Sequence, residues 1–479
     1  MVTIGMSFHS FTFIFALLPV TVAGYFVLGR LPDRRWAKSW LIIASLVFFT
    51  ASSARDLPLL AGSVAFNWLI AIQLMKKDAS PTSRRTLFIV GISTNIAFLC
   101  YFKYATFFLQ GFDLVLGAKV AVPHPSFPLG ISFYTICQIM FLVDCYEGLV
   151  EEHNTLDHFV FAGFFPYVTM GPIVRWKQVV PQLNDPKGWS PNSDNVAKGL
   201  FVFVIGFFKK VVLADSFFRW ADAAFRYDHP LSLIGGWIGA TAFAFQLYFD
   251  FGGYTDMAIG AALMLNISLP QNFNAPFRAR SIIDYWRRWH ITLSNFITTY
   301  LYTPMIRAMA RVTFPKALLA TFAAMVIAGF WHGANWTFII FGSLHGMALV
   351  LNQFWRKMKW PIPEPLAWIA TFVFVIVSLV FFRSSSVTQA IHIIGSIFTL
   401  HAGLFNYDPW MGIDRVDQVM GIGWMLFGVV LLFRAPSSLE LERNFRPSLA
   451  SVTIAVALAL VACLYANGVV SRSFVYRDF

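Results

Sequence analysis

Long apolar runs separated by short polar gaps are the dominant pattern along this chain. They lie near residues 8–29, 39–54, 58–75, 86–109, 128–146, 157–174, 196–214, 231–249, 316–332, 336–354, 366–382, 413–433 and 449–468. A helix that crosses a bilayer needs about 20 residues. The pattern therefore predicts an all-α polytopic membrane protein with roughly 11 transmembrane helices, the other runs forming re-entrant or interfacial helices.

The composition agrees with this prediction. Of the 479 residues, 57% are hydrophobic and only 13% are charged, whereas soluble domains carry about 25% charged residues. The polar gaps leave no room for a soluble domain, and no internal repeat of the kind found in many transporters is evident. We expect one integral membrane domain over residues 1–479, with N-terminal helices (1–125), a core (126–360) and C-terminal helices (361–479).

The positive charge also fits a membrane protein. The net charge is +12, and its Lys and Arg residues fall in short loops between apolar runs. This distribution is typical of cytoplasmic loops and argues against a nucleic-acid partner. The loops at 31–38 and 76–85 are basic and two spans apart, so both are predicted to be cytoplasmic, with the N-terminus on the other side. The run at 8–29 is too long for a signal-peptide core and is expected to stay as an anchor.

A histidine inside the membrane is the first candidate for chemistry. Basic residues precede the run at 316–332 and follow the run at 336–354, so the two runs are predicted to form a helical hairpin with His332 at its tip. The 16 residues from Lys316 to His332 rise roughly 24 Å, which places His332 deep in the bilayer or near its far side. An ionisable side chain there indicates a functional site, and an imidazole can take the proton of an incoming hydroxyl.

A second cluster precedes the hairpin and ends in His290. Arg287 and Arg288 would disfavour its charged form and keep a neutral ring available, and they could also hold the phosphates of a nucleotide-like cofactor. The alternative is an interfacial anchor in which Arg288 pairs with Asp284 four residues earlier and Trp286 lies at the membrane surface. The sequence leaves both interpretations of the arginines open.

The region from 249 to 302 is polar, and its backbone is expected to be broken at glycines such as Gly252 and Gly253, which at membrane depth is tolerated only where the backbone is buried in protein or lines a water-filled cavity. We therefore expect it to form a wall of a cavity reached from the cytoplasm. His345, Asn335 and Asp256 are secondary site candidates, and His345 could serve only close helix packing beside Gly342 and Gly346. No metal-ligand, P-loop or dinucleotide-binding motif is present, so no metal is expected.

Several motifs together resemble the membrane-bound O-acyltransferase (MBOAT) family, and in particular its bacterial branch that acetylates exported polysaccharides such as alginate. They are Pro128-Leu129-Gly130-Ile131-Ser132-Phe133, Gly171-Pro172-Ile173-Val174-Arg175, Phe249-Asp250-Phe251-Gly252-Gly253-Tyr254-Thr255-Asp256, Asn272-Phe273-Asn274-Ala275-Pro276-Phe277, Trp286-Arg287-Arg288-Trp289-His290 and Trp331-His332-Gly333. The segment after Pro304 departs from the branch pattern. The aromatic tail ending at Phe479 is similar to that of the branch.

The resemblance implies an enzyme with helices around a central funnel. His332 would match the family's membrane histidine, acting as general base or transient acyl carrier, with His290 as a second functional position. The donor would be cytoplasmic acetyl-CoA, used as a substrate and not held as a permanent cofactor, with Asp284, Trp286, Arg287 and Arg288 near it. The chain would lie among the lipids of the bacterial inner membrane. It would acetylate an exported polysaccharide through a periplasmic partner similar to SGNH hydrolases.

Three alternatives stay open. D-alanyl-transferring relatives share both histidines, so these residues do not identify the acyl group. A lipid acyltransferase of the same family would place its product in the lipid fraction. A transporter or flippase of a polyprenyl-linked sugar would use the histidines to line a polar path without chemistry.

Overall fold

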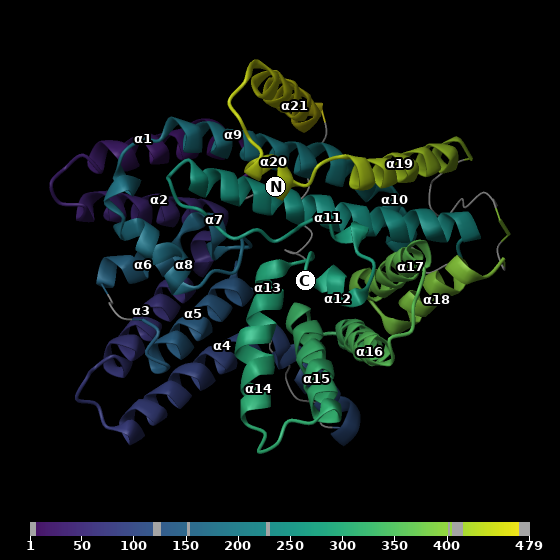
Figure 1. The fold of residues 1–479 in the computed structure, drawn as a ribbon, viewed down its shortest axis with the longest axis horizontal. Helices are drawn as coiled ribbons and strands as arrows, with labels where there is room; N and C mark the ends of the chain where they lie inside the picture. Colours follow the sequence, from purple (N-terminus) through teal and green to yellow (C-terminus); the bar gives the residue numbers. More distant parts are fainter. Residues whose placement is uncertain are drawn as a thin grey trace. The chain divides into compact units, whose positions relative to one another are not determined.

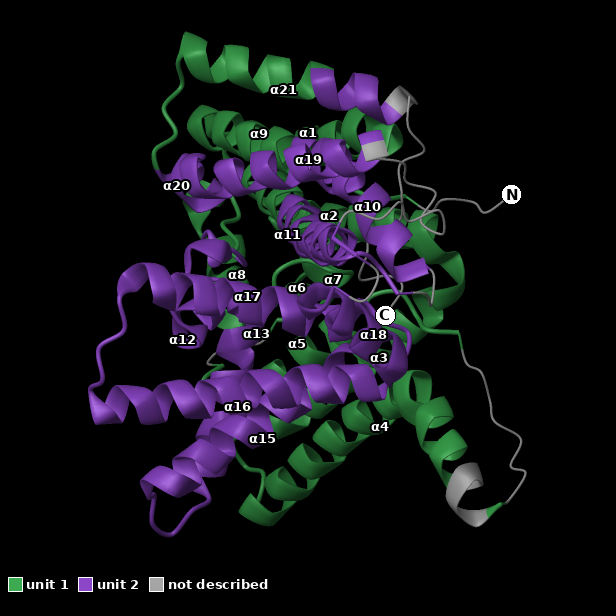
Figure 2. Cartoon of the chain, turned by 90° about the vertical axis from the view of Figure 1, so that its right-hand side faces the viewer, with its two compact units in different colours: residues 1–207, 254–271, 444–460 green, residues 208–253, 272–443, 461–479 purple. Residues whose placement is uncertain are grey.

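A computed structural model describes residues 6–117, 126–150, 154–226, 230–400, 403–404 and 415–468. These residues form helices and connecting segments, with no β-strand among them, so the all-α fold class is confirmed. The chain forms two compact units from separate stretches of sequence (Figure 2). Unit 1 comprises residues 1–207, 254–271 and 444–460, and unit 2 comprises residues 208–253, 272–443 and 461–479. The proposed division at 125 and 360 stays a prediction.

Unit 1 contains most of the N-terminal half of the chain. Its helices are the π-helix η1 (Phe13–Leu17), α1 (Leu18–Leu28), α2 (Arg35–Ser53), α3 (Leu57–Leu74), α4 (Pro81–Leu116), α5 (Ile131–Tyr146), α6 (Thr155–Gly163), α7 (Phe165–Val168), α8 (Trp176–Asn184) and nearly all of α9 (Ser193–Phe208).

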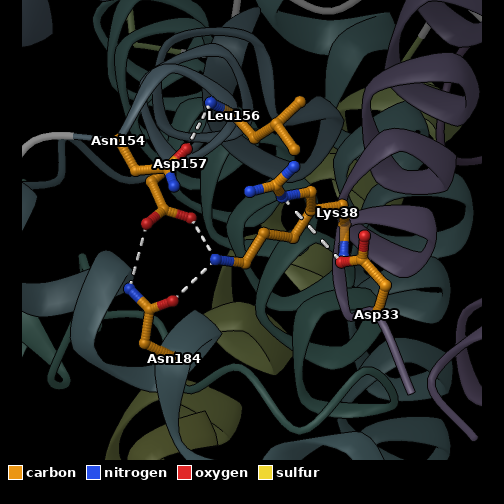
Figure 3. A network of polar contacts seen from close by, with 7 residues as sticks. Asp33, Lys38, Asn154, Leu156, Asp157 and Asn184 are labelled. Carbon is orange, nitrogen blue, oxygen red and sulfur yellow. Dashed lines mark hydrogen bonds and ion pairs between the residues drawn. The ribbon is translucent and has the colours of Figure 1, made fainter. Parts of the chain in front are cut away.

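A buried polar network joins three helices of unit 1 (Figure 3). Lys38 of α2 donates from Nζ to Asp157 Oδ1 of α6 at 2.5 Å and to Asn184 Oδ1 of α8 at 2.6 Å, and Asn184 Nδ2 donates to Asp157 Oδ2 at 3.0 Å. Because a buried charge is costly unless it is paired and hydrogen-bonded, these contacts explain how Lys38 is accommodated with 7% exposure. The last basic residue of the loop at 31–38 is therefore part of the packed interior.

Unit 2 contains the candidate site. Its helices are the π-helix η4 (Lys209–Ala214), α10 (Asp215–Arg226), α12 (Ile282–Trp286), α13 (Ile291–Phe296), the π-helix η6 (Ile297–Tyr302), α14 (Thr303–Arg307), α15 (Phe314–His332), α16 (Trp336–Met358), α17 (Glu364–Arg383), α18 (Val387–Phe398), α19 (Arg415–Arg434) and α20 (Ser438–Arg443). Besides α9, whose last residue Phe208 belongs to unit 2, two helices contribute to both units, α11 (Leu233–Leu263) and α21 (Leu449–Gly468).

The predicted hairpin is confirmed. Helices α15 and α16 are neighbours in both views (Figures 1 and 2) and make extensive contact. Two glycines allow this approach: a Cβ on Gly329 would lie 2.6 Å from the Cα of Gly342, and a Cβ on Gly342 would lie 2.6 Å from the carbonyl oxygen of Met325. Small residues at such positions let helix backbones approach closely in membranes.

Seven helical segments among the described residues are long and apolar enough to cross a membrane. They are Arg35–Leu74, Pro81–Phe112, Phe314–His332, Trp336–Met358, Glu364–Arg383, Val416–Arg434 and Leu449–Ala466. The first consists of α2 and α3 joined by the 3-10 turn Ala54–Asp56, which matches the two predicted runs at 39–54 and 58–75. The chain is a multi-pass membrane protein, and the total of roughly 11 spans stays a prediction.

Two expectations about local structure were wrong. The run at 157–174 is not one span, because it divides into α6 and α7 at Phe164, where the backbone is extended, and α7 starts at Phe165 with Pro166 in its first turn. The glycines at 252 and 253 do not interrupt the backbone, since α11 continues through them to Leu263. A Cβ on Gly252 would meet only the ring of Phe273, at an ordinary 3.8 Å.

Candidate active site

His332 is the last residue of α15 and is 6% exposed. Aromatic side chains from the two helices of the hairpin, α15 and α16, and from α17 surround its ring. The ring centres lie 5.0 Å from Trp331 of α15, 6.3 Å from Phe341 of α16 and 5.1 Å from Phe382 of α17. The predicted place of His332 at the hairpin tip is confirmed, and aromatic rings lie around it.

Asn335 holds the turn that follows His332. Its Oδ1 accepts a hydrogen bond from the backbone N–H of Thr337 at 3.1 Å, which caps α16, and its Nδ2 donates to the carbonyl oxygen of Ser385 at 3.0 Å. Asparagine is one of the preferred N-cap residues. The structure therefore supports a role for Asn335 in fixing the tip rather than in chemistry.

His290 lies in a conformation that is unusual for a residue with a side chain. Its φ of 43° and ψ of 53° are left-handed, a region that non-glycine residues occupy at a cost and mainly where the surroundings enforce it. The loop at Asn272 supplies this constraint. The carbonyl oxygen of Asn272 accepts a hydrogen bond from the N–H of Ile291 at 2.9 Å. Its Oδ1 accepts from the N–H and the hydroxyl of Thr292 at 3.3 and 2.6 Å.

The imidazole of His290 is fully buried, with 0% exposure. Among the described residues, neither ring nitrogen has a hydrogen-bond partner. Burial lowers the pKa of His290 to about 3, because removal from water disfavours the charged form. The expectation of a neutral ring agrees with this direction, but the cause is burial and not the adjacent arginines.

A continuous aromatic cluster connects the surroundings of the two histidines. From His332 it passes to Phe341, whose ring centre lies 4.5 Å from that of His345. The His345 ring lies 6.1 Å from Tyr285, and Tyr285 lies 5.7 Å from Trp289. It continues with the remaining ring pairs Trp289–Phe273 at 5.0 Å, Phe273–Phe251 at 5.2 Å and Phe251–His290 at 4.8 Å. Unit 2 thus brings His332, His345 and His290 into one packed cluster from different parts of the sequence.

Each ring nitrogen of His345 has a partner. Trp286 Nε1 donates to His345 Nδ1 at 3.2 Å, and His345 Nε2 lies 2.9 Å from the hydroxyl of Ser378. An indole N–H can only donate, so Nδ1 is the acceptor and Nε2 carries the proton. Ser378 in turn donates to the carbonyl oxygen of Val375 at 2.9 Å. These contacts favour the packing interpretation of His345.

The two adjacent arginines differ in their surroundings. Arg288 Nε donates to Asp284 Oδ1 at 2.8 Å and its Nη1 to the carbonyl oxygen of Asn274 at 3.3 Å. The expected pair with Asp284 therefore exists, although α12 ends before it, at Trp286. Arg287 is exposed and lines a cavity. The structure supports an anchoring role for Arg288 and leaves Arg287 as the residue that could meet an anion.

That cavity has a volume of about 580 Å³, within the range of 300–1,000 Å³ typical of small-molecule sites. Its wall combines apolar and polar side chains with two arginines, Arg287 and Arg356. The other lining residues are Ile283, Trp286, Ile291, Ser294, Asn295, Ile297, Thr298, Tyr302, Thr321, Ala324, Met325, Leu349 and Gln353. The predicted cavity wall within residues 249–302 is thus found from 283 onward, opposite residues of the hairpin.

Sequence reasoning missed the hairpin's share of this cavity. Arg356 was interpreted only as part of a basic flank. Its spacing from Leu349 and Gln353, seven and three residues earlier, places all three on one face of α16. This spacing is visible in the sequence and would have predicted that the three side chains face the same way. Asp256 is a separate case: it belongs to unit 1, where it lies buried on α11, and it stays a secondary prediction.

Comparison with known proteins identifies the family of the chain. Residues 144–388 match the model of MBOAT, the membrane-bound O-acyltransferase family. The chain is 39% identical to a peptidoglycan O-acetyltransferase of Helicobacter pylori, over 82% of this chain and 80% of that protein. It is 34% identical to a probable alginate O-acetylase of Pseudomonas aeruginosa, over 85% of this chain and 76% of that protein.

A more distant relative is a teichoic acid D-alanyltransferase of Bacillus subtilis, 28% identical over 50% of this chain and 65% of that protein. The chain belongs to the membrane-bound O-acyltransferase family, and the predicted enzyme class is confirmed.

Proposed function

We propose that this protein is a polysaccharide O-acetyltransferase that uses acetyl-CoA and works in the bacterial inner membrane. The cavity of unit 2 carries this proposal, because a mixed apolar and polar wall with two arginines suits a long anionic thioester. Arg287 and Arg356 would attract its phosphates. The relatives named for acetylation of peptidoglycan and alginate support acetyl as the group transferred and a sugar hydroxyl as the acceptor.

His332 is proposed as the general base. Its imidazole takes the proton of the acceptor hydroxyl as that oxygen attacks the thioester carbonyl. The carbon–sulfur bond breaks, the thiolate of coenzyme A leaves and takes up the proton, and an O-acetyl ester forms. If the transfer has two steps, His332 instead holds the acetyl group briefly. The neutral ring of His290 would orient the thioester or assist proton transfer.

A periplasmic partner completes the proposal. Because the candidate site lies on helices of a membrane protein, final transfer to a polymer outside the membrane would use a protein with its own nucleophile, of the SGNH-hydrolase kind. The D-alanyl alternative has one observation in its favour, the relative acting on teichoic acid. It would use a different donor, so the choice of donor in the assay separates the two.

The test is acetyl transfer from labelled acetyl-CoA by the full-length protein in proteoliposomes. His332→Ala should abolish transfer, whereas His392→Ala, which removes an exposed histidine on α18, should not change it. Wild-type turnover by His332→Ala would contradict the catalytic role and favour a transporter. Label found in membrane lipid instead of an added sugar acceptor would favour a lipid acyltransferase.

A further inference from the structure

The hydrogen-bond chain through His345 starts at the wall of the cavity. Trp286 contributes to the lining, and it is itself only 8% exposed. Its indole N–H points to His345, which is fully buried on α16, and His345 is bonded in turn to Ser378 of α17, which is 1% exposed. One wall residue of α12 is therefore tied through two buried side chains to two long helices.

The surroundings of His345 leave it little freedom. Its ring packs against Phe341 at 4.5 Å, Phe374 at 5.1 Å and Tyr285 at 6.1 Å. Since Nδ1 accepts and Nε2 donates, the imidazole is neutral and has one defined tautomer. Charging the ring would place a second proton on Nδ1, where the indole N–H already points. A base at this position would have to break the bond to Trp286.

We propose that His345 is a positioning residue for the acyl donor: it fixes the Trp286 indole as a rigid part of the cavity wall, and Arg287, the next residue, is placed with it. This proposal rests on the proposed function, because it assumes that the cavity receives the donor. It differs from the catalytic interpretation of His345, since the side chain acts on binding and not on the reacting atoms. A wall held by a buried bond is preorganised and loses less freedom when the donor binds.

Two substitutions separate the two bonds of His345. Asparagine places Oδ1 at the same number of bonds from Cα as histidine Nδ1, so His345→Asn keeps an acceptor for Trp286 and loses the contact with Ser378. Glutamine places Nε2 at the same number of bonds from Cα as histidine Nε2, so His345→Gln keeps a donor for Ser378 and has no acceptor at the position of Nδ1, to which Trp286 donates. Both variants lose the ring, so each controls for the packing lost in the other.

Steady-state kinetics of the full-length protein test the proposal. His345→Gln and Trp286→Phe should each raise the KM for acetyl-CoA roughly fivefold to tenfold, the loss expected for one buried hydrogen bond, with kcat nearly unchanged. His345→Asn should stay within about twofold of the wild-type KM. Equal KM values for the Asn and Gln variants would overturn the proposal, as would a loss of kcat alone in both.

The indole N–H resonance gives a readout that does not depend on activity. In protein labelled with ¹⁵N-tryptophan, the signal missing from Trp286→Phe belongs to Trp286. It should shift in His345→Gln and stay close to its position in His345→Asn. If wild-type protein does not use acetyl-CoA but this shift occurs, the proposed donor is wrong and the bond is real. If the donor is used and the signal is the same in both variants, the positioning role is wrong.

Discussion

Asn272 Oδ1 accepts both the backbone N–H and the hydroxyl of Thr292, at 3.3 and 2.6 Å, and so holds the chain two residues after His290. The loop at Asn272 and the start of α13 are thereby joined where the backbone of His290 is left-handed. Such a conformation persists only when its neighbours enforce it. The position of the His290 ring therefore depends on Asn272, which lies far from His290 in the sequence.

Thr292→Val should weaken this support while keeping the shape of the side chain. We expect kcat to fall by roughly tenfold or more, since a displacement of 1 Å can cost about 100-fold in rate, and we expect the donor KM to change little. Thr399→Val is the matched control, because Thr399 is exposed and its hydroxyl donates to the carbonyl oxygen of Gly395 near the end of α18. Equal kcat in both variants would show that His290 does not need this loop.

A glycine in the close contact of α15 and α16 and a glycine in open space on α19 should respond differently in stability when each is replaced by alanine. Gly329→Ala should lower the free energy of unfolding by about 1–3 kcal/mol, because the added Cβ would lie 2.6 Å from the Cα of Gly342 and the helices would have to separate. Gly423→Ala on α19 meets nothing within 4 Å, so it should be neutral or stabilise by up to about 1 kcal/mol.

Thermal unfolding in the same detergent measures both glycine variants. Activity gives a second measure, because separating the hairpin displaces His332 at its tip. A Gly329→Ala protein with the unfolding midpoint and turnover of the wild type would mean that the two helices do not pack this closely.

The hairpin and the place of His332 were predictable from the sequence, because they depend on local rules. Apolar length predicts the two helices, basic residues at both outer ends predict that these ends lie on the same side of the membrane, and Gly333 follows the last turn. The same rules failed at 157–174, where one proline outweighs an apolar run of spanning length.

The contacts of the site were less predictable, because they join residues far apart in the chain. Nothing local indicates that Trp286 bonds to His345, or that Thr292 depends on Asn272. Arg287 and Arg288 are adjacent and identical, and only the position at which α12 ends sends one to the cavity and the other to Asp284. The family resemblance indicated both histidines and Trp286 as site residues, but it did not indicate the hydrogen bonds that hold Trp286 and Thr292 in place.

The two arginines should respond differently to the same substitution. Arg287→Gln should raise the KM for acetyl-CoA by roughly tenfold, because an exposed guanidinium in the cavity wall is lost, and the wild-type KM should rise with salt as screening weakens this attraction. Arg288→Gln should leave the KM unchanged and lower the free energy of unfolding by about 0.2–1 kcal/mol, the usual contribution of a partly exposed ion pair.

Asp284→Asn tests this assignment from the other partner. It should reproduce the effect of Arg288→Gln on unfolding and have no effect on donor binding, measured by the KM for acetyl-CoA at low and high salt. If Arg288→Gln raises the KM as much as Arg287→Gln, the ion pair does not keep Arg288 from the donor, and the two arginines act together.

The burial of His290 predicts a loss of stability in acid. Its folded-state pKa is lowered to about 3 by burial, and its unfolded-state pKa is about 6.5. Between these values the unfolded chain binds one more proton than the folded chain, so the free energy of unfolding falls as the pH drops below 6.5. At pH 5 the contribution of this residue is about 2 kcal/mol, because 1.5 pH units each cost about 1.4 kcal/mol.

Unfolding midpoints at pH 7.5 and pH 5 measure this effect. His290→Asn removes the titrating group, so the drop in midpoint between the two pH values should be smaller than in the wild type. His392→Ala removes an exposed histidine and should keep the wild-type drop. The comparison uses the difference between pH values in each variant, so a general loss of stability in His290→Asn cancels. A drop in His290→Asn as large as that of the wild type would mean that the His290 ring is hydrated or charged in the folded protein.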